Sequence, residues 1–135
     1  MSYRIANIEG IGPVYAAKLV EAGIKTTGSL LESCHDPKGR DMLSERTEIS
    51  PHLLLKWTNM ADLMRIKGIG CQFAELLEAS GVDTVKELTH RQAGNLAAKM
   101  AEVNAEKRLC RVSPGSAVVA KWIEQANSLE AAILY

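Results

Sequence analysis

The chain has few aromatic residues and no surplus of either charge. Its 135 residues include two Trp, three Tyr and one Phe, and its 16 acidic side chains balance its 16 basic ones. A dedicated DNA-binding protein usually shows a basic surplus or stripe, so the balance argues against a broadly basic surface, and any attraction to phosphate must be local. The local basic groups are Arg65 and Lys67 with Lys56 before them, and the cluster of Lys107, Arg108 and Arg111.

Cysteine is scarce and scattered. Cys34, Cys71 and Cys110 are odd in number and widely spaced, which fits neither a disulfide framework nor a zinc site. We expect them to be small buried hydrophobic residues. The histidines lack carboxylate or cysteine partners at a spacing typical of a metal site or a catalytic triad, so we predict no catalytic residue, no metal site and no cofactor. The histidines are His35, His52 and His90.

Long apolar runs are also missing. No stretch approaches the roughly 18 apolar residues that a membrane span needs. The N-terminus carries one early Arg4 and no continuous apolar core, so it does not have the pattern of a signal peptide. We therefore expect a cytoplasmic protein that makes no membrane contact.

What the sequence does contain is a duplication. Residues 8–12, I-E-G-I-G, recur at 66–70 as I-K-G-I-G, and the likeness continues at a constant offset of 58. A repeat of this kind defines the structural unit. Over segments 8–32 and 66–90, nine of 25 positions are identical: Ile8/Ile66, Gly10/Gly68, Ile11/Ile69, Gly12/Gly70, Ala16/Ala74, Leu19/Leu77, Gly23/Gly81, Thr26/Thr84 and Leu30/Leu88.

Each copy places an isoleucine between two glycines. The glycines let the backbone turn sharply and expose its amides, while the isoleucine can enter the core between two helices. A helix that begins directly after such a turn attracts anions, because its first amides carry a partial positive charge. Later in each copy, Gly23 and Gly81 stand where a helix would end in a left-handed residue.

Two further segments share a helical pattern. Ser50-Pro51 and Ser113-Pro114 each predict a helix start, because serine is a good N-cap and proline suits the first helical position. Apolar spacing gives each helix one buried face that includes its tryptophan. The predicted faces are Leu53, Trp57, Met60, Ala61 and Met64 in the first, and Val118, Trp122, Gln125, Ala126 and Leu129 in the second.

These patterns predict an all-α protein in which two tandem units, 1–65 and 66–135, pack as one compact helical body. We expect both tryptophans in the core and a long helix with Leu96, Met100 and Val103 on its buried edge. Strands have almost no support. The predicted helices lie near 3–7, 13–22, 27–34, 37–47, 51–65, 71–80, 85–90, 92–108 and 114–130.

Segments 8–32 and 66–90 resemble the helix-hairpin-helix motif. Its usual form is a hydrophobic residue, a small turn reading G-I-G or G-V-G, and a helix with alanine and leucine at fixed steps. Both copies have this form. The wider duplicated pattern, including M-A-D-L-M-R-I-K-G-I-G at 60–70, resembles an uncharacterised bacterial family catalogued only as a domain of unknown function.

The resemblance implies contact with a nucleic-acid backbone. In the motif, hairpin amides hold phosphates without reading bases, and a monovalent cation sometimes contacts the hairpin carbonyls. We therefore expect a non-enzymatic module that binds DNA weakly and without sequence specificity, mainly through the second hairpin. The first hairpin is expected to be mainly structural, because Glu9 would face an incoming phosphate. The candidate residues are Arg65, Lys67, Gly68, Ile69 and Gly70 in the second hairpin, and Gly10, Ile11 and Gly12 in the first.

A protein-interaction adaptor is the alternative. DNA-binding members of the motif commonly place a basic residue just after the second glycine, whereas this chain has Pro13-Val14-Tyr15 and Cys71-Gln72-Phe73. Together with the zero net charge, this favours hairpins that are purely structural and a helical surface that binds a protein partner. The sequence does not discriminate DNA from RNA.

Overall fold

Helix α4 (Pro51–Leu63) runs between the other helices in the computed structural model, which describes residues 3–135. Ser50 accepts hydrogen bonds from the amides of His52 and Leu53, and Pro51 stands in the first turn, where its missing N–H breaks no bond. Residues 57–63 of the helix are all buried. A helix buried on every side lies at the centre of a core.

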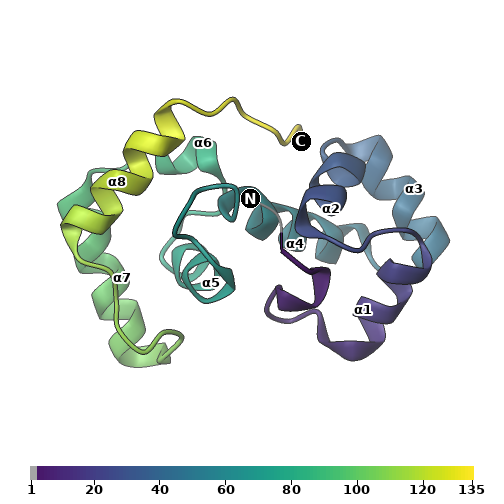
Figure 1. Ribbon diagram of the computed structural model, residues 1–135, viewed down its shortest axis with the longest axis horizontal. Coiled ribbons are helices and arrows are strands. Elements are labelled where there is room, and N and C mark those ends of the chain that lie inside the picture. The colour runs from purple at the N-terminus through teal and green to yellow at the C-terminus, as the bar shows by residue number, and fades with distance from the viewer. Residues whose placement is uncertain (1–2) are drawn as a thin grey trace.

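Three helices and a 3-10 turn lie on one side of α4 (Figure 1). They are η1 (Ile5–Asn7), α1 (Gly12–Glu21), α2 (Thr27–Cys34) and α3 (Pro37–Thr47). Thr26 caps α2 in a capping box with Ser29, and Asp36 caps α3 by accepting from the amide of Gly39. Both α2 and α3 pack against α4.

Four helices lie on the other side of α4 (Figure 1): α5 (Cys71–Ala79), α6 (Val85–Leu88), α7 (Ala93–Lys107) and α8 (Ser116–Asn127). The long α7 packs along α8. Its buried edge is Leu96, Met100 and Val103, as predicted. The packing of α5 against both α4 and α7 joins this group to the centre.

The chain is all-α, as predicted. Within residues 3–135 there is no strand, only an isolated antiparallel bridge between Arg4 and Thr26. None of the described helices is both long enough and apolar enough to cross a bilayer.

The predicted helices match those of the structure, with two exceptions. Segment 3–7 forms only the three-residue 3-10 turn η1. The second Ser-Pro segment does not begin its helix at Pro114, because α8 starts at Ser116 with Gly115 as its N-cap. Its buried face is consequently Val119, Trp122 and Ala126, whereas Val118 and Leu129, which we had placed on that face, are exposed.

Helices α1 and α5 end in the same way. Each is followed by a left-handed glycine, Gly23 with φ +90° and Gly81 with φ +97°. In both, the glycine amide donates to the carbonyl three residues earlier and the next amide donates to the carbonyl five residues earlier. The predicted left-handed glycines are confirmed.

An aromatic pair also occurs in both halves. Tyr15 of α1 lies 5.3 Å from Trp57 of α4 with the rings tilted by 58°, and Phe73 of α5 lies 5.2 Å from Trp122 of α8 at 57°. Tilted ring contacts add to the stabilisation that area burial gives. Both tryptophans are almost fully buried, which confirms their predicted place in the core.

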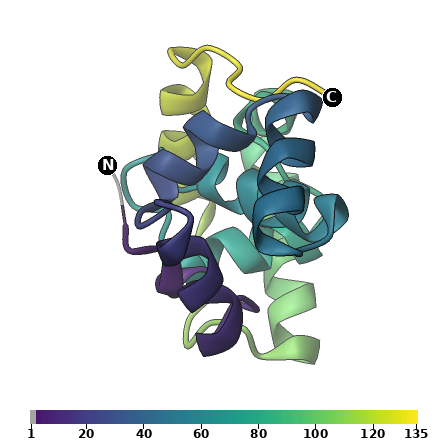
Figure 2. The ribbon, with the colours of Figure 1, turned by 90° about the vertical axis from the view of Figure 1, so that its right-hand side faces the viewer.

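A C-terminal strap, residues 128–135, joins the two groups of helices. The amide of Leu134 donates to the carbonyl of His35 at 2.6 Å, and Arg40 donates to the carbonyl of Leu134 at 2.9 Å. The Tyr135 hydroxyl donates to Asn59 of α4 at 3.2 Å. In Figures 1 and 2 the yellow strap leaves α8 and ends beside the blue segment that holds α2 and α3.

Candidate phosphate-binding site

Hairpin 1 (residues 8–12) and hairpin 2 (residues 66–70) each bury their central isoleucine. Ile11 and Ile69 are 2% and 0% exposed, as predicted. The first glycine is left-handed in both hairpins, with φ +90° at Gly10 and φ +100° at Gly68. A residue with a side chain would be strained there, so the glycines are a requirement of the turn.

Helix α8 covers one side of hairpin 2. The Gln125 side chain accepts from the amide of Lys67 at 3.0 Å and donates to the carbonyl of the same residue at 3.1 Å. A Cβ added to Gly68 would lie 3.2 Å from Nε1 of Trp122. The Lys67 amide is thus already bound within the protein, whereas its side chain is exposed.

Arg65, expected beside the phosphate, is directed at the protein itself. Its Nε lies 3.1 Å from Oδ1 of the buried Asp62, without the alignment of a hydrogen bond. Its two terminal nitrogens donate to the carbonyl of Glu130 in the C-terminal strap at 2.7 and 3.2 Å. Arg65 therefore fastens the strap to the end of α4, and its guanidinium is bound by Asp62 and Glu130.

Asp62 is the most buried carboxylate near hairpin 2. Burial raises the pKa of the Asp62 carboxyl, while the Val85 amide, which donates to its Oδ2 at 2.8 Å, and the Arg65 guanidinium oppose that rise. The nearby Asp83 carboxylate adds to it. The carboxylate holds α6 against the end of α4.

The N-terminus of α5 lies directly after hairpin 2. Its N-cap, Gly70, has φ −94° and offers no side-chain acceptor. The first amides of a helix have no acceptor inside the helix, so those of α5 must be satisfied from outside it. Around Gly70 there is open space, because a Cβ built there meets no atom within 4 Å.

An open hollow of about 450 Å³, here named the α5 depression, surrounds this helix start. One wall is the hairpin and the first turn of α5, and the other is loop 108–115. The lining residues are Gly68, Gly70, Cys71, Gln72, Phe73, Cys110, Arg111 and Val112.

Loop 108–115 brings Arg111 to hairpin 2. The loop leaves α7 at Arg108, which is left-handed with φ +52°. The side chain of Asn104 then holds the backbone of Cys110 with two hydrogen bonds, of 2.9 and 3.0 Å. This turn places the next residue, Arg111, in the wall of the α5 depression. The basic cluster was visible in the sequence, but nothing in the spacing indicated that it meets a hairpin more than 40 positions earlier.

Hairpin 1 provides a poorer anion site. Its second glycine, Gly12, is left-handed with φ +69°, and the following Pro13 has no N–H to donate. Glu9 is exposed on the same hairpin. Burial, and then the charge of Glu9, raise the pKa of the Glu75 carboxyl on α5, so hairpin 1 lies close enough to α5 for the two carboxylates to repel each other.

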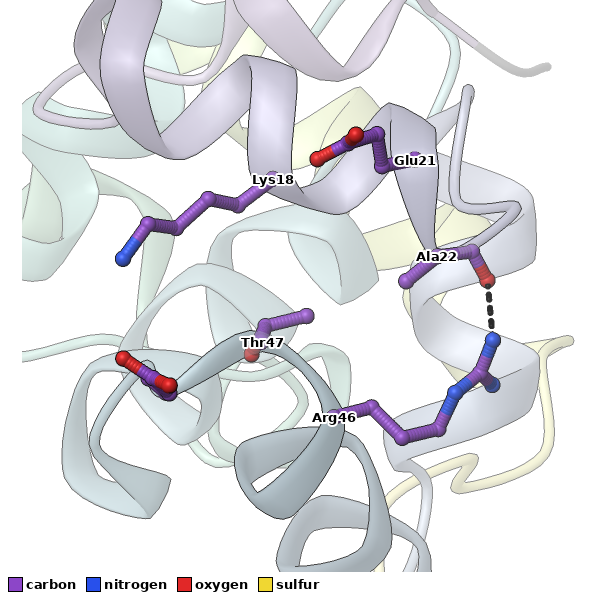
Figure 3. Close-up of a pocket in the computed structure, with 6 residues that line it drawn as sticks. Lys18, Glu21, Ala22, Arg46 and Thr47 are labelled. Carbon is purple, nitrogen blue, oxygen red and sulfur yellow. Dashed lines mark hydrogen bonds between the residues drawn. The ribbon is translucent and has the colours of Figure 1, made fainter.

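A second hollow, of about 480 Å³, lies between α1 and α3 (Figure 3). Arg46 closes one end by donating to the carbonyl of Ala22 at 3.1 Å. The other charged side chains are Lys18, Glu21 and Glu48. Two positive and two negative groups cancel, so this hollow has no preference for an ion of either sign.

The three cysteines differ in their surroundings. Burial raises the pKa of the Cys34 thiol to about 11, and that residue is fully buried as expected. Cys71 and Cys110 meet the expectation only in part, because both pack against the core but also lie in the wall of an open depression. Across residues 3–135, no group of three or more His, Cys, Asp or Glu side chains is arranged to hold a metal ion.

Comparison with known proteins gives one match. A family model described as a domain of unknown function matches residues 9–129, which is most of the chain. No curated protein and no solved structure matches the chain significantly.

Proposed function

Since the chain belongs to the DUF4332 family, whose description is a domain of unknown function, we propose its function from its own geometry. It is a non-enzymatic module that contacts the phosphate backbone of a nucleic acid at the α5 depression, weakly and without reading bases. The observation that carries the proposal is the meeting of the uncapped first turn of α5 with Arg111 in one open hollow.

The two halves are, on this proposal, tandem helix-hairpin-helix units, 1–65 and 66–135. Three correspondences support the assignment. The first hairpin glycine is left-handed in both halves, and the following helix ends at a left-handed glycine in both. A tilted ring contact also joins that helix to a tryptophan, on α4 in the first half and on α8 in the second. Apart from the first glycine of each hairpin, these features involve residues outside the G-I-G motif.

The chemistry of the depression suits a phosphate oxygen. Gly70 leaves the helix start uncovered, so the partial positive charge of the first amides is accessible to an anion. Arg111 can add a guanidinium with paired donors, which matches the geometry of phosphate. The exposed Lys67 ammonium on hairpin 2 supplies a second charge. Contacts of these kinds fix a backbone and carry no base specificity.

Hairpin 1 keeps a structural role in this proposal. Pro13 removes one of the donors of its helix start, and Glu9 places a negative charge on the turn. On this proposal, the hairpin packs η1 and α1 against the core through Gly10, Ile11 and Gly12. The division of roles expected from the sequence is retained, but Arg111 replaces Arg65 as the principal cation.

A protein-interaction adaptor is the second candidate, and one observation favours it. Val112, which is 75% exposed, and the half-buried Phe73 line the same depression as Arg111. An exposed apolar side chain beside one cation can bind a peptide that carries an apolar residue next to an acidic one. On this reading the hairpins are turns only.

The test is binding of fluorescently labelled duplex and single-stranded DNA at low salt, followed by a salt titration. Wild-type protein should bind in the micromolar range, and Arg111→Glu should weaken binding by about tenfold or more, since it reverses a charge at the contact. With Arg111 and Lys67 neutralising about two phosphates, log Kd should change with log salt with a slope of about 2.

Lys121→Glu provides the matched control. Lys121 is exposed on α8, outside the α5 depression, and the substitution changes the net charge by the same amount. Its binding should stay within about twofold of wild type. Equal loss in both variants would mean that net charge alone governs binding. No binding to either DNA form at low salt would overturn the proposal and leave the adaptor.

A further inference from the structure

Two thiols from distant parts of the sequence meet in the α5 depression. Cys71 is the first residue of α5, so its backbone is fixed by the helix. Cys110 lies in loop 108–115, which has no regular secondary structure. Both residues line the same hollow and both are partly buried.

The electrostatics of Cys110 agree with the place of both thiols in one hollow. Burial raises the pKa of the Cys110 thiol, and the charges of Glu75 and of Cys71 itself raise it further. The third cysteine, Cys34, is sealed in the core between α2 and α4 and takes no part.

We propose that Cys71 and Cys110 form a reversible intramolecular disulfide, which makes the α5 depression a redox modification site. A disulfide needs its two Cα atoms within about 7 Å, and Cys110 lies in a loop without regular structure, tied to α7 by the side chain of Asn104. The oxidant is a low-molecular-weight disulfide such as oxidised glutathione. The site joins a fixed helical thiol to a thiol on an adjustable loop.

The reaction balances without any other reagent. The thiolate of Cys71 attacks one sulfur of oxidised glutathione, forms a mixed disulfide and releases one glutathione thiolate. Cys110 then loses its proton and attacks the Cys71 sulfur, which releases the second glutathione thiolate. One protein dithiol and one small disulfide become one protein disulfide and two reduced glutathione molecules after protonation.

Oxidation would also act on the phosphate contact, and this consequence alone rests on the proposed function. Arg111 follows Cys110 directly, so a bond from Cys110 to the start of α5 would fix the guanidinium relative to the first-turn amides. The DNA affinity of the oxidised protein should therefore differ from that of the reduced protein by at least severalfold.

The experiment is peptide mapping of the wild-type protein after incubation in oxidised glutathione and blocking of free thiols. Trypsin should release peptide 68–86 joined to peptide 109–111, and the bond should disappear on reduction. The number of thiols titrated in denaturant should fall from three to one. Cys34→Ser should retain the joined peptides, whereas Cys71→Ser and Cys110→Ser should each lose them.

Two outcomes would overturn the disulfide. The first is glutathione retained on Cys71 or Cys110 without joined peptides, and the second is a bond only between two chains. Because the wild-type map needs no variant, a misfolded cysteine variant does not affect the result. Joined peptides in a protein that does not bind DNA would remove the proposed function and leave the disulfide standing.

Discussion

At the scale of single residues, hairpin 2 has less room for a side chain at its first glycine than hairpin 1 has, although the two hairpin sequences differ at one position only. Gly10 and Gly68 both need a positive φ, but a Cβ on Gly10 would meet no atom within 4 Å, whereas one on Gly68 would press on Trp122 at 3.2 Å. The difference arises because α8 packs against the second copy only. The first glycine has the same left-handed conformation in both hairpins, and the neighbouring helix restricts it in hairpin 2.

Alanine at the two positions should therefore have unequal effects. Gly10→Ala should lower the free energy of unfolding by about 1 kcal/mol through backbone strain alone. Gly68→Ala should lower it by about 2 kcal/mol or more, because the indole must also shift. Urea unfolding of the two variants measures both values. Equal losses would mean that α8 does not press on hairpin 2.

The titration of the Asp62 carboxyl should be visible in the pH dependence of stability. Because burial raises the pKa of its carboxyl in the folded state, the folded protein binds this proton more tightly than the unfolded chain does. The stability that this proton gives is present at low pH and is lost as pH rises through the folded pKa. The Asp62→Asn variant has no carboxyl to deprotonate, so it does not lose this stability. Its free energy of unfolding relative to that of wild type should therefore increase from about pH 4 upwards.

Urea midpoints of wild type and Asp62→Asn at several pH values would measure that difference. Asp41→Asn is the control, since Asp41 is exposed on α3. A constant offset between wild type and Asp62→Asn across the pH range would mean that the carboxyl titrates normally in the folded protein.

At the scale of elements, the sequence was sufficient wherever a local signal sets a helix end. Ser50-Pro51, Asp36-Pro37 and the left-handed Gly81 all act within a few residues, and the helices they bound were predicted to within two residues. The start of α8 was missed because Gly115, not Ser113, is the N-cap. The strap 128–135 was not predicted at all, since it is held by bonds to residues far away in the chain.

The strap gives a prediction at this scale. The Arg40 guanidinium is buried and donates to the carbonyls of Cys34 and Leu134, both at 2.9 Å. Arg40→Met should lower the free energy of unfolding by about 2–3 kcal/mol, because it removes two charge-assisted bonds and leaves a buried carbonyl without a donor. Thermal or urea unfolding measures the loss.

Arg46→Met is the matched control for that experiment. Arg46 lies on the same helix, is exposed, and makes one bond, to the carbonyl of Ala22. Loss of this bond in Arg46→Met should lower the free energy of unfolding by less than about 1 kcal/mol. Similar losses for both arginines would mean that the strap adds little to stability.

At the scale of the whole molecule, the sequence predicted the fold class and not the arrangement of the candidate site. The buried isoleucines and tryptophans follow from periodicity, which is a local property. The place of Arg111 beside hairpin 2 and that of Cys71 and Cys110 in one hollow depend on how distant elements pack. The same holds for the bonds that Arg65 donates to Glu130 of the strap. Such contacts join residues that no short window of sequence compares.

The strap also determines how the protein unfolds. Two groups of helices that were independent would unfold one after the other, each with its own midpoint. Here α4 serves both halves, and residues from the end of the second half are bonded to His35 and Arg40 of the first. Neither group of helices can open without breaking bonds to the other, so the protein should unfold in a single cooperative step.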